Sequence, residues 1–126
     1  MQSTERHVEV DVKPEFLPDE SDPMRGMWMY AYHVRITNRG KETVQLRNRH
    51  WIITDANGRT EEVRGPGVVG QQPVLRPGEH FEYTSGCPLP TAMGTMHGTY
   101  EMVTSTGERF DAPIPPFTLA EPYSVN

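Results

Sequence analysis

The sequence contains a single cysteine, Cys87, among 126 residues. No internal disulfide can therefore form, and nothing in the cysteine usage indicates an oxidising compartment. Long hydrophobic runs are also missing, because the longest, Met27 to Tyr32, is far shorter than the roughly 20 residues that a membrane-spanning helix needs. We therefore expect a soluble, cytoplasmic protein with no membrane partner.

Spacings typical of metal sites and of catalytic centres are absent as well. The five histidines lie at least 17 residues apart, and no C-x-x-C, H-x-H or H-x-x-x-H pattern occurs. We predict no metal site, although distant strands can still assemble one with the cysteine as a soft ligand. No G-x-S-x-G pattern accompanies the serines, so we expect a protein that is not an enzyme and uses no cofactor.

The net charge of −5 is concentrated at the start of the chain. The first 22 residues carry seven acidic side chains and two basic ones, whereas acidic and basic residues balance in the remainder. Overall acidity repels polyanions, so we expect no nucleic-acid partner. The acidic arm is interpreted either as solubilising charge or as a docking surface for a basic partner.

Glycine and proline are abundant, with 11 and 12 residues, so secondary-structure elements should be short and turns frequent. The longest stretch free of both, Lys41 to Asn57, is rich in residues that prefer strands. Seven or eight short strands joined by turns predict an all-β fold. We expect a single antiparallel β-sandwich of the immunoglobulin or fibronectin type III kind, with flexible ends at 1–7 and 120–126.

Apolar residues at every second position predict the strands, and a break in this alternation predicts one β-bulge. Val8 to Val12 and Trp28 to Ile36 each keep one parity, as half-buried strands do. The apolar positions change from even to odd numbers after Leu46, which predicts a β-bulge between Arg47 and His50. The predicted core comprises Val10, Val12, Trp28, Tyr30, Val34, Ile36, Leu46, Trp51, Ile53, Phe81, Tyr83, Tyr100, Met102 and Phe110.

Proline also predicts where strands end and which strand lies at an edge. Residues 14–25 contain three prolines and five charges, and residues 85–96 combine glycine with proline, so both segments are predicted to be irregular connections. Pro113, Pro115 and Pro116 restrict the last strand to a sheet edge, because proline cannot donate to a ladder on both sides.

Residues 64–70 read Arg-Gly-Pro-Gly-Val-Val-Gly, a G-x-G-x-x-G pattern in an unusual setting. The dinucleotide fingerprint needs a strand that leads into a helix, and the prolines that follow prevent a helix here. Two interpretations stay open for this glycine loop. It is a structural corner with Val68 and Val69 packed inward, or a surface for an anion or a partner that uses its backbone N–H groups.

Arg47 and Arg49 flank the predicted bulge, and bulges often re-aim side chains toward a site. Arginine suits bidentate contact with phosphate or carboxylate, whereas on a solvated strand the same side chains pair with nearby glutamates. We predict that the two arginines converge on the glycine loop. The candidate anion or partner surface comprises Arg64, Gly65, Gly67, Gly70, Arg47 and Arg49.

Four segments resemble the bacterial ApaG family, also called CorD. They are LRNRHWIITDANG at 46–58, EVRGPGVVG at 62–70, FEYTSG at 81–86 and IPPFTL at 114–119. The resemblance covers nearly the whole chain. It implies a fibronectin type III-like sandwich, an association with cobalt resistance and magnesium efflux, and no established catalytic residues.

The resemblance also bears on the kind of function to expect. Similar domains occur in eukaryotic F-box proteins, which fits a portable interaction unit. We therefore expect a non-catalytic binding module with a protein partner, monomeric rather than oligomeric, whose cobalt or magnesium effects are indirect. The alternative is a weak phosphoanion or nucleotide (pyrophosphate) binding protein, or a small enzyme, that uses the glycine loop.

Overall fold

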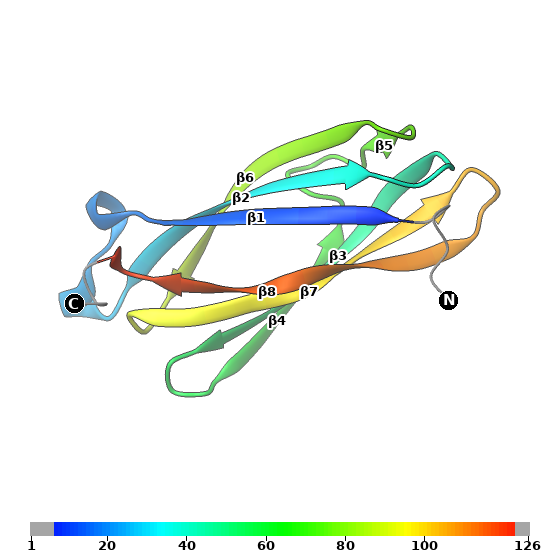
Figure 1. Ribbon diagram of the computed structural model, residues 1–126. Coiled ribbons are helices and arrows are strands. Elements are labelled where there is room, and N and C mark those ends of the chain that lie inside the picture. The colour runs from blue at the N-terminus through cyan, green and yellow to red at the C-terminus, as the bar shows by residue number, and fades with distance from the viewer. Residues whose placement is uncertain (1–6, 123–126) are drawn as a thin grey trace.

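The computed structural model describes residues 7–122, which form two facing sheets of antiparallel strands (Figure 1). The helical elements of these residues are two short 3₁₀ turns, Pro18–Glu20 and Pro23–Arg25, and none is long and apolar enough to cross a membrane. The strands are β1 (Val8–Phe16), β2 (Trp28–Asn38), β3 (Val44–Asp55), β4 (Thr60–Pro66), β5 (Val74–Leu75), β6 (His80–Leu89), β7 (Met93–Thr104) and β8 (Arg109–Ala120). The predicted β-sandwich of seven to eight strands is confirmed.

The strand order defines two sides of the sandwich. One sheet has the order β1-β2-β6, and the other has the order β4-β3-β7-β8 with β5 paired to the start of β3. The edge strands β1 and β8 contact each other along one side. The edge strands β4 and β6 therefore lie on the opposite side, where no pairing joins the two sheets within the described chain.

Side chains that point between the sheets form one buried cluster, as the alternating pattern predicts. Five predicted core residues are only partly buried, because they lie on edge strands or near strand ends: Val12, Trp28, Ile53, Phe81 and Phe110. Buried residues that the core prediction omitted include Tyr32, Val44, Val68, Leu75, Cys87, Leu89, Met96 and Leu119.

The predicted β-bulge is present at the start of the expected interval. The register between β3 and β7 shifts between Leu46 and Asn48, so Arg47 is the extra residue. Beyond the bulge, Arg49 pairs across from the buried Tyr100 and points toward the interior side of the sheet. The insertion therefore decides which face of β3 each later side chain occupies.

Of the two segments predicted to be irregular connections, residues 85–96 consist largely of strand, whereas residues 14–25 belong to a strand element only at 14–16. β1 continues through Pro14, which pairs with Tyr32, because an edge strand tolerates the missing N–H. β6 extends to Leu89 and β7 begins at Met93, so most of residues 85–96 belongs to a hairpin. The prediction was correct for residues 17–25 and wrong for 14–16 and for most of 85–96, because proline and glycine also occur within edge strands and beside tight turns.

The predicted flexible ends, 1–7 and 120–126, lie mostly outside the described residues. Within the described part, the carbonyl of His7 accepts a hydrogen bond from the Arg39 N–H at 2.8 Å. Ala120 pairs with Met93 as the last residue of β8.

Candidate functional site

The glycine loop continues an edge strand and closes in a tight hairpin. Arg64, Gly65 and Pro66 are the last residues of β4 and pair with β3. Val68 and Gln71 exchange backbone hydrogen bonds of 2.8 and 2.9 Å. Between them, Val69 and Gly70 have positive φ angles of 44° and 79°, the signs required by a type I′ hairpin turn.

The bulge and the glycine loop lie against each other, through the side chain of Arg49 and the backbone carbonyl of Arg47. Nη1 of Arg49 donates hydrogen bonds to the carbonyl oxygens of Pro66 and Gly67, each at 3.0 Å. A Cβ placed on Gly65 would lie 3.0–3.1 Å from three atoms of that guanidinium. The carbonyl of Arg47 accepts a hydrogen bond of 2.9 Å from the Gly67 N–H. Both arginines therefore help to hold the loop on β3.

Hydrogen bonds within the protein already use several of the loop donors that could bind an anion. The N–H groups of Gly67, Val68 and Gln71 all donate to backbone carbonyls. The guanidinium of Arg49 is directed at carbonyl oxygens of the loop rather than at open solvent. These contacts make the loop rigid and leave few of its groups to bind a phosphate.

The loop instead exposes aliphatic side chains. Val68 is buried as predicted, but the prediction that Val69 also packs inward is wrong, because its side chain is 53% exposed. Val74 on β5 is 56% exposed. Within residues 7–122, Val69 is the non-glycine residue with a positive φ, a conformation that costs about 1–2 kcal/mol. An unfavourable backbone conformation thus presents an aliphatic side chain to solvent.

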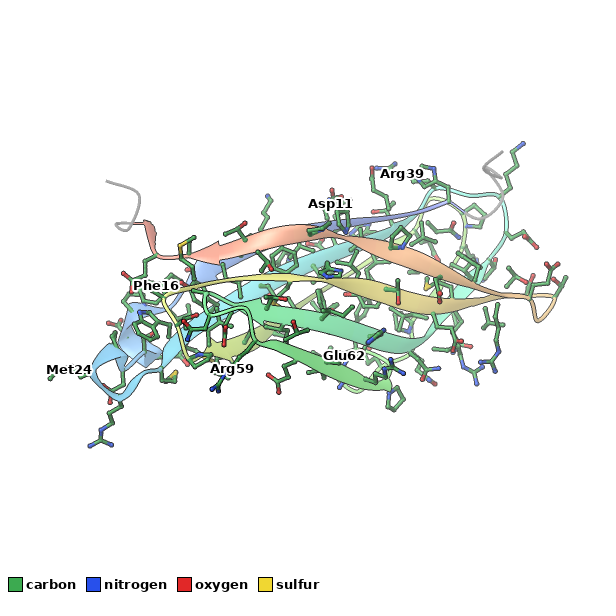
Figure 2. All side chains as sticks on the ribbon, turned by 90° about the horizontal axis from the view of Figure 1, so that it is seen from below. Asp11, Phe16, Met24, Arg39, Arg59 and Glu62 are labelled. Carbon is green, nitrogen blue, oxygen red and sulfur yellow. The ribbon has the colours of Figure 1, made fainter. Side chains whose placement is uncertain are left out.

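Arg64 lies on the outer face of the larger sheet, where it pairs across from His50. Its Nη2 bonds to Oε1 of Glu62 at 3.2 Å, and His50 Nε2 bonds to the same oxygen at 2.7 Å. Glu62 is labelled in Figure 2. The hydrogen bond with His50, with a smaller contribution from Arg64, holds the pKa of Glu62 below its usual value. A shallow hollow of about 480 Å³ covers this face and brings together three of the predicted site residues, Arg49, Arg64 and Gly65. The other residues that line it are Asn48, His50, Pro66, Thr99, Glu101 and Asp111.

A second hollow, of about 250 Å³, opens between β6 and the strands β3 and β4. We call it the side crevice. Its lining includes Tyr32, Arg49, Trp51, Val63, Ser85 and Cys87. Burial raises the pKa of Tyr32 and raises that of Cys87 to about 11, so both groups stay neutral near pH 7. Sequence reasoning missed this crevice, because parity does not show which strand edges face each other.

Histidine and carboxylate side chains pair with each other on the outer faces of both sheets. Among residues 7–122, no group of three or more His, Cys, Asp or Glu side chains is arranged to hold a metal ion. Nε2 of His33 and Nε2 of His80 lie 2.8 and 3.3 Å from the carboxylate of Glu82. The hydrogen bond with His33 is the main cause that lowers the pKa of Glu82.

Comparisons with known proteins identify the same family over most of the chain. The sequence model of the ApaG domain matches residues 18–104. Protein ApaG of Rhodospirillum centenum is 61% identical over 118 residues, which covers 94% of this chain and 91% of the relative. Protein ApaG of Bradyrhizobium sp. (strain ORS 278) is 60% identical over 117 residues, with 93% and 90% covered.

A solved structure agrees with the fold. A crystal structure from Bordetella pertussis, of a protein given the name ApaA, superposes with a TM-score of 0.92 at 54% sequence identity. The match covers 96% of this chain and 98% of that one. The resemblance found in four sequence segments is therefore confirmed, and the chain belongs to the ApaG family.

Proposed function

We propose that this ApaG-family chain is a non-catalytic binding module of the cytoplasm, whose contact surface for a protein partner is residues 67–75. We call these residues the valine loop. The observation that carries the proposal is the exposure of Val69 and Val74 on a segment fixed by internal hydrogen bonds. Binding residues concentrate on loops that a rigid scaffold positions. A preformed loop also loses little conformational entropy when it binds.

A protein partner fits this surface better than a phosphoanion. The loop N–H groups named above are engaged, whereas aliphatic side chains are exposed. The backbone carbonyl of the exposed Arg47 accepts hydrogen bonds from Gly67 and Gln72 of the loop, so Arg47 supplies a cation at its rim. Apolar contacts surrounded by arginine are typical of protein interfaces. We expect a partner segment with apolar and acidic side chains. Any effect of this protein on cobalt resistance or magnesium efflux would then be indirect and would depend on that partner.

Substitution of the two exposed valines tests this proposal. Asparagine adopts a left-handed conformation more readily than valine. Val69→Asn should therefore keep the fold, and stabilise it by about 1 kcal/mol, while removing the aliphatic contact. The double variant Val69→Asn/Val74→Asn should lose a partner that the wild type captures from its native cytoplasm. Ile52→Asn, on the outer face of β3, is the control and should retain that partner.

Two results would refute the proposed surface. One is partner capture by the double variant at the level of the wild type. The other is a large loss of stability in Val69→Asn, which would give the exposed valine a structural role. Both variants need a β-rich circular dichroism spectrum before the capture result is interpreted.

The convergence of Arg47 and Arg49 on residues 64–70 favours a second candidate, a weak phosphoanion site. Amide chemical shifts measured during titration with phosphate, pyrophosphate and ATP would test it. Shifts confined to residues 47–50 and 64–70 would support this candidate over the protein surface. Because few donors of the loop are available, we expect at most roughly millimolar affinity.

A further inference from the structure

The side crevice reaches a core aromatic residue. Trp51 and Met96 line it and are 2% and 1% exposed. Trp51 lies on β3 and pairs directly across from Val63 on β4, which also lines the crevice. Because no strand pairing joins β4 to β6 within residues 7–122, the crevice opens between the two sheets. Its position is separate from the exposed valines of the valine loop.

Trp51 holds a hydrogen-bond donor with no acceptor. Its Nε1 is shielded from solvent and has no hydrogen-bond partner among residues 7–122. The chain's other tryptophan, Trp28, donates from Nε1 to Glu121 at 2.7 Å. The aromatic neighbours of Trp51 are Tyr32, Tyr100 and Phe117, with ring centroids 5.2 to 6.2 Å away. Ring faces are weak acceptors, so a buried N–H in this position calls for a better one.

The remaining lining groups define the chemistry of a ligand. Arg49 and Ser85 also line the crevice, where the Ser85 hydroxyl is hydrogen-bonded to Tyr32, and Ile53, Val63 and Met96 form apolar walls. A hollow of about 250 Å³ lies just below the range of about 300–1,000 Å³ typical of pockets for larger ligands. These features suit one small ring that carries an acceptor with negative charge.

We propose that the side crevice binds a small aromatic carboxylate. Its ring lies against the apolar walls, and its carboxylate accepts hydrogen bonds from Nε1 of Trp51 and from Nη2 of Arg49, because Nη1 of Arg49 already donates to the carbonyls of Pro66 and Gly67. In the free protein the indole N–H is shielded, so the ligand reaches it by displacing a lining side chain. Met96 is suited to this movement because its side chain has three rotatable bonds. Glu61 also lines the crevice, and its carboxylate repels the negative charge of the ligand.

The two tryptophans allow a direct test by nuclear magnetic resonance. In ¹⁵N-labelled protein, benzoate should shift the indole N–H signal of Trp51 downfield and leave that of Trp28 in place. Benzamide, a neutral acceptor, should give a smaller response at the same concentration. Benzylamine carries the ring without an acceptor and should give none.

Three variants connect the response to the crevice. Val63→Phe should fill the hollow and abolish the benzoate shift of Trp51. Ile52→Phe places the same bulk on the outer face of β3 and should preserve the shift. Glu61→Gln removes the opposing charge and should strengthen benzoate binding. Circular dichroism of each variant verifies that the fold is retained.

The outcomes are distinguishable. If millimolar benzoate leaves the chemical shift of the Trp51 indole N–H unchanged, the proposal is wrong. It is also wrong if benzoate and benzylamine give equal responses, or if the response persists in folded Val63→Phe. Because none of these residues belongs to the valine loop, the result is independent of the protein-partner proposal.

Discussion

Gly65→Ala tests whether Arg49 clamps the glycine loop. Gly65 lies in β4 without a positive φ, so alanine suits its backbone. At such a position, Gly→Ala ordinarily stabilises a protein by about 0.4–1 kcal/mol, because it reduces the entropy of the unfolded chain. Here the added Cβ would lie 3.0–3.1 Å from three guanidinium atoms of Arg49. The guanidinium must therefore move away from β4.

The cost of that movement follows from the two hydrogen bonds that it breaks. Arg49 donates to the carbonyls of Pro66 and Gly67 at 3.0 Å each. A hydrogen bond contributes about 0.5–1.5 kcal/mol net, and the Arg49 side chain is only partly buried, so we assign about 1–2 kcal/mol to the pair. After the gain from alanine, Gly65→Ala should lower the free energy of unfolding by about 0.5–1.5 kcal/mol.

A double-mutant cycle measured by urea denaturation with tryptophan fluorescence isolates the clamp. In the Arg49→Ala background the obstructing guanidinium is gone, so Gly65→Ala should become stabilising. Arg47→Ala is the matched control, in which Gly65→Ala should still destabilise. Stabilisation by Gly65→Ala in the wild type, or the same effect in both arginine backgrounds, would refute the clamp.

Three further predictions rest on burial and on paired charges. Trp51→Ala should lower the free energy of unfolding by about 3–5 kcal/mol, because the indole is 2% exposed; a cost under about 1 kcal/mol in denaturant titration would contradict this packing. Burial raises the pKa of Tyr30 from 10.0 to about 12, so stability that is complete below pH 10 should be lost as the pH rises toward 12. Tyr30→Phe should weaken this alkaline slope in pH-dependent unfolding, and an unchanged slope would rule out this phenol as its source. The pKa of Glu82, followed by carboxyl NMR, should lie below 4.5 and rise in His33→Gln, whereas Glu62, bonded to a different histidine, should be unaffected.

Local patterns were sufficient to predict most strands, the bulge and the family. Alternation of apolar residues works because successive side chains of a strand point to opposite faces. For the same reason, the change of parity after Leu46 predicted an extra residue between Arg47 and His50, which the structure identifies as Arg47. Pro14 was misassigned to a loop because proline is compatible with both a loop and an edge strand. Only the order of strands in the sheet decides between these two environments.

The alternating pattern was sufficient to predict the sandwich, because a chain with no predicted helical segment can bury the apolar faces of its strands only between facing sheets. The tertiary structure alone decided which side chains meet. It turned Arg49 toward the loop carbonyls, placed Arg64 on the outer face, and left the indole N–H of Trp51 without an acceptor among the described residues. These outcomes depend on contacts between strands far apart in the chain, about which local periodicity carries no information.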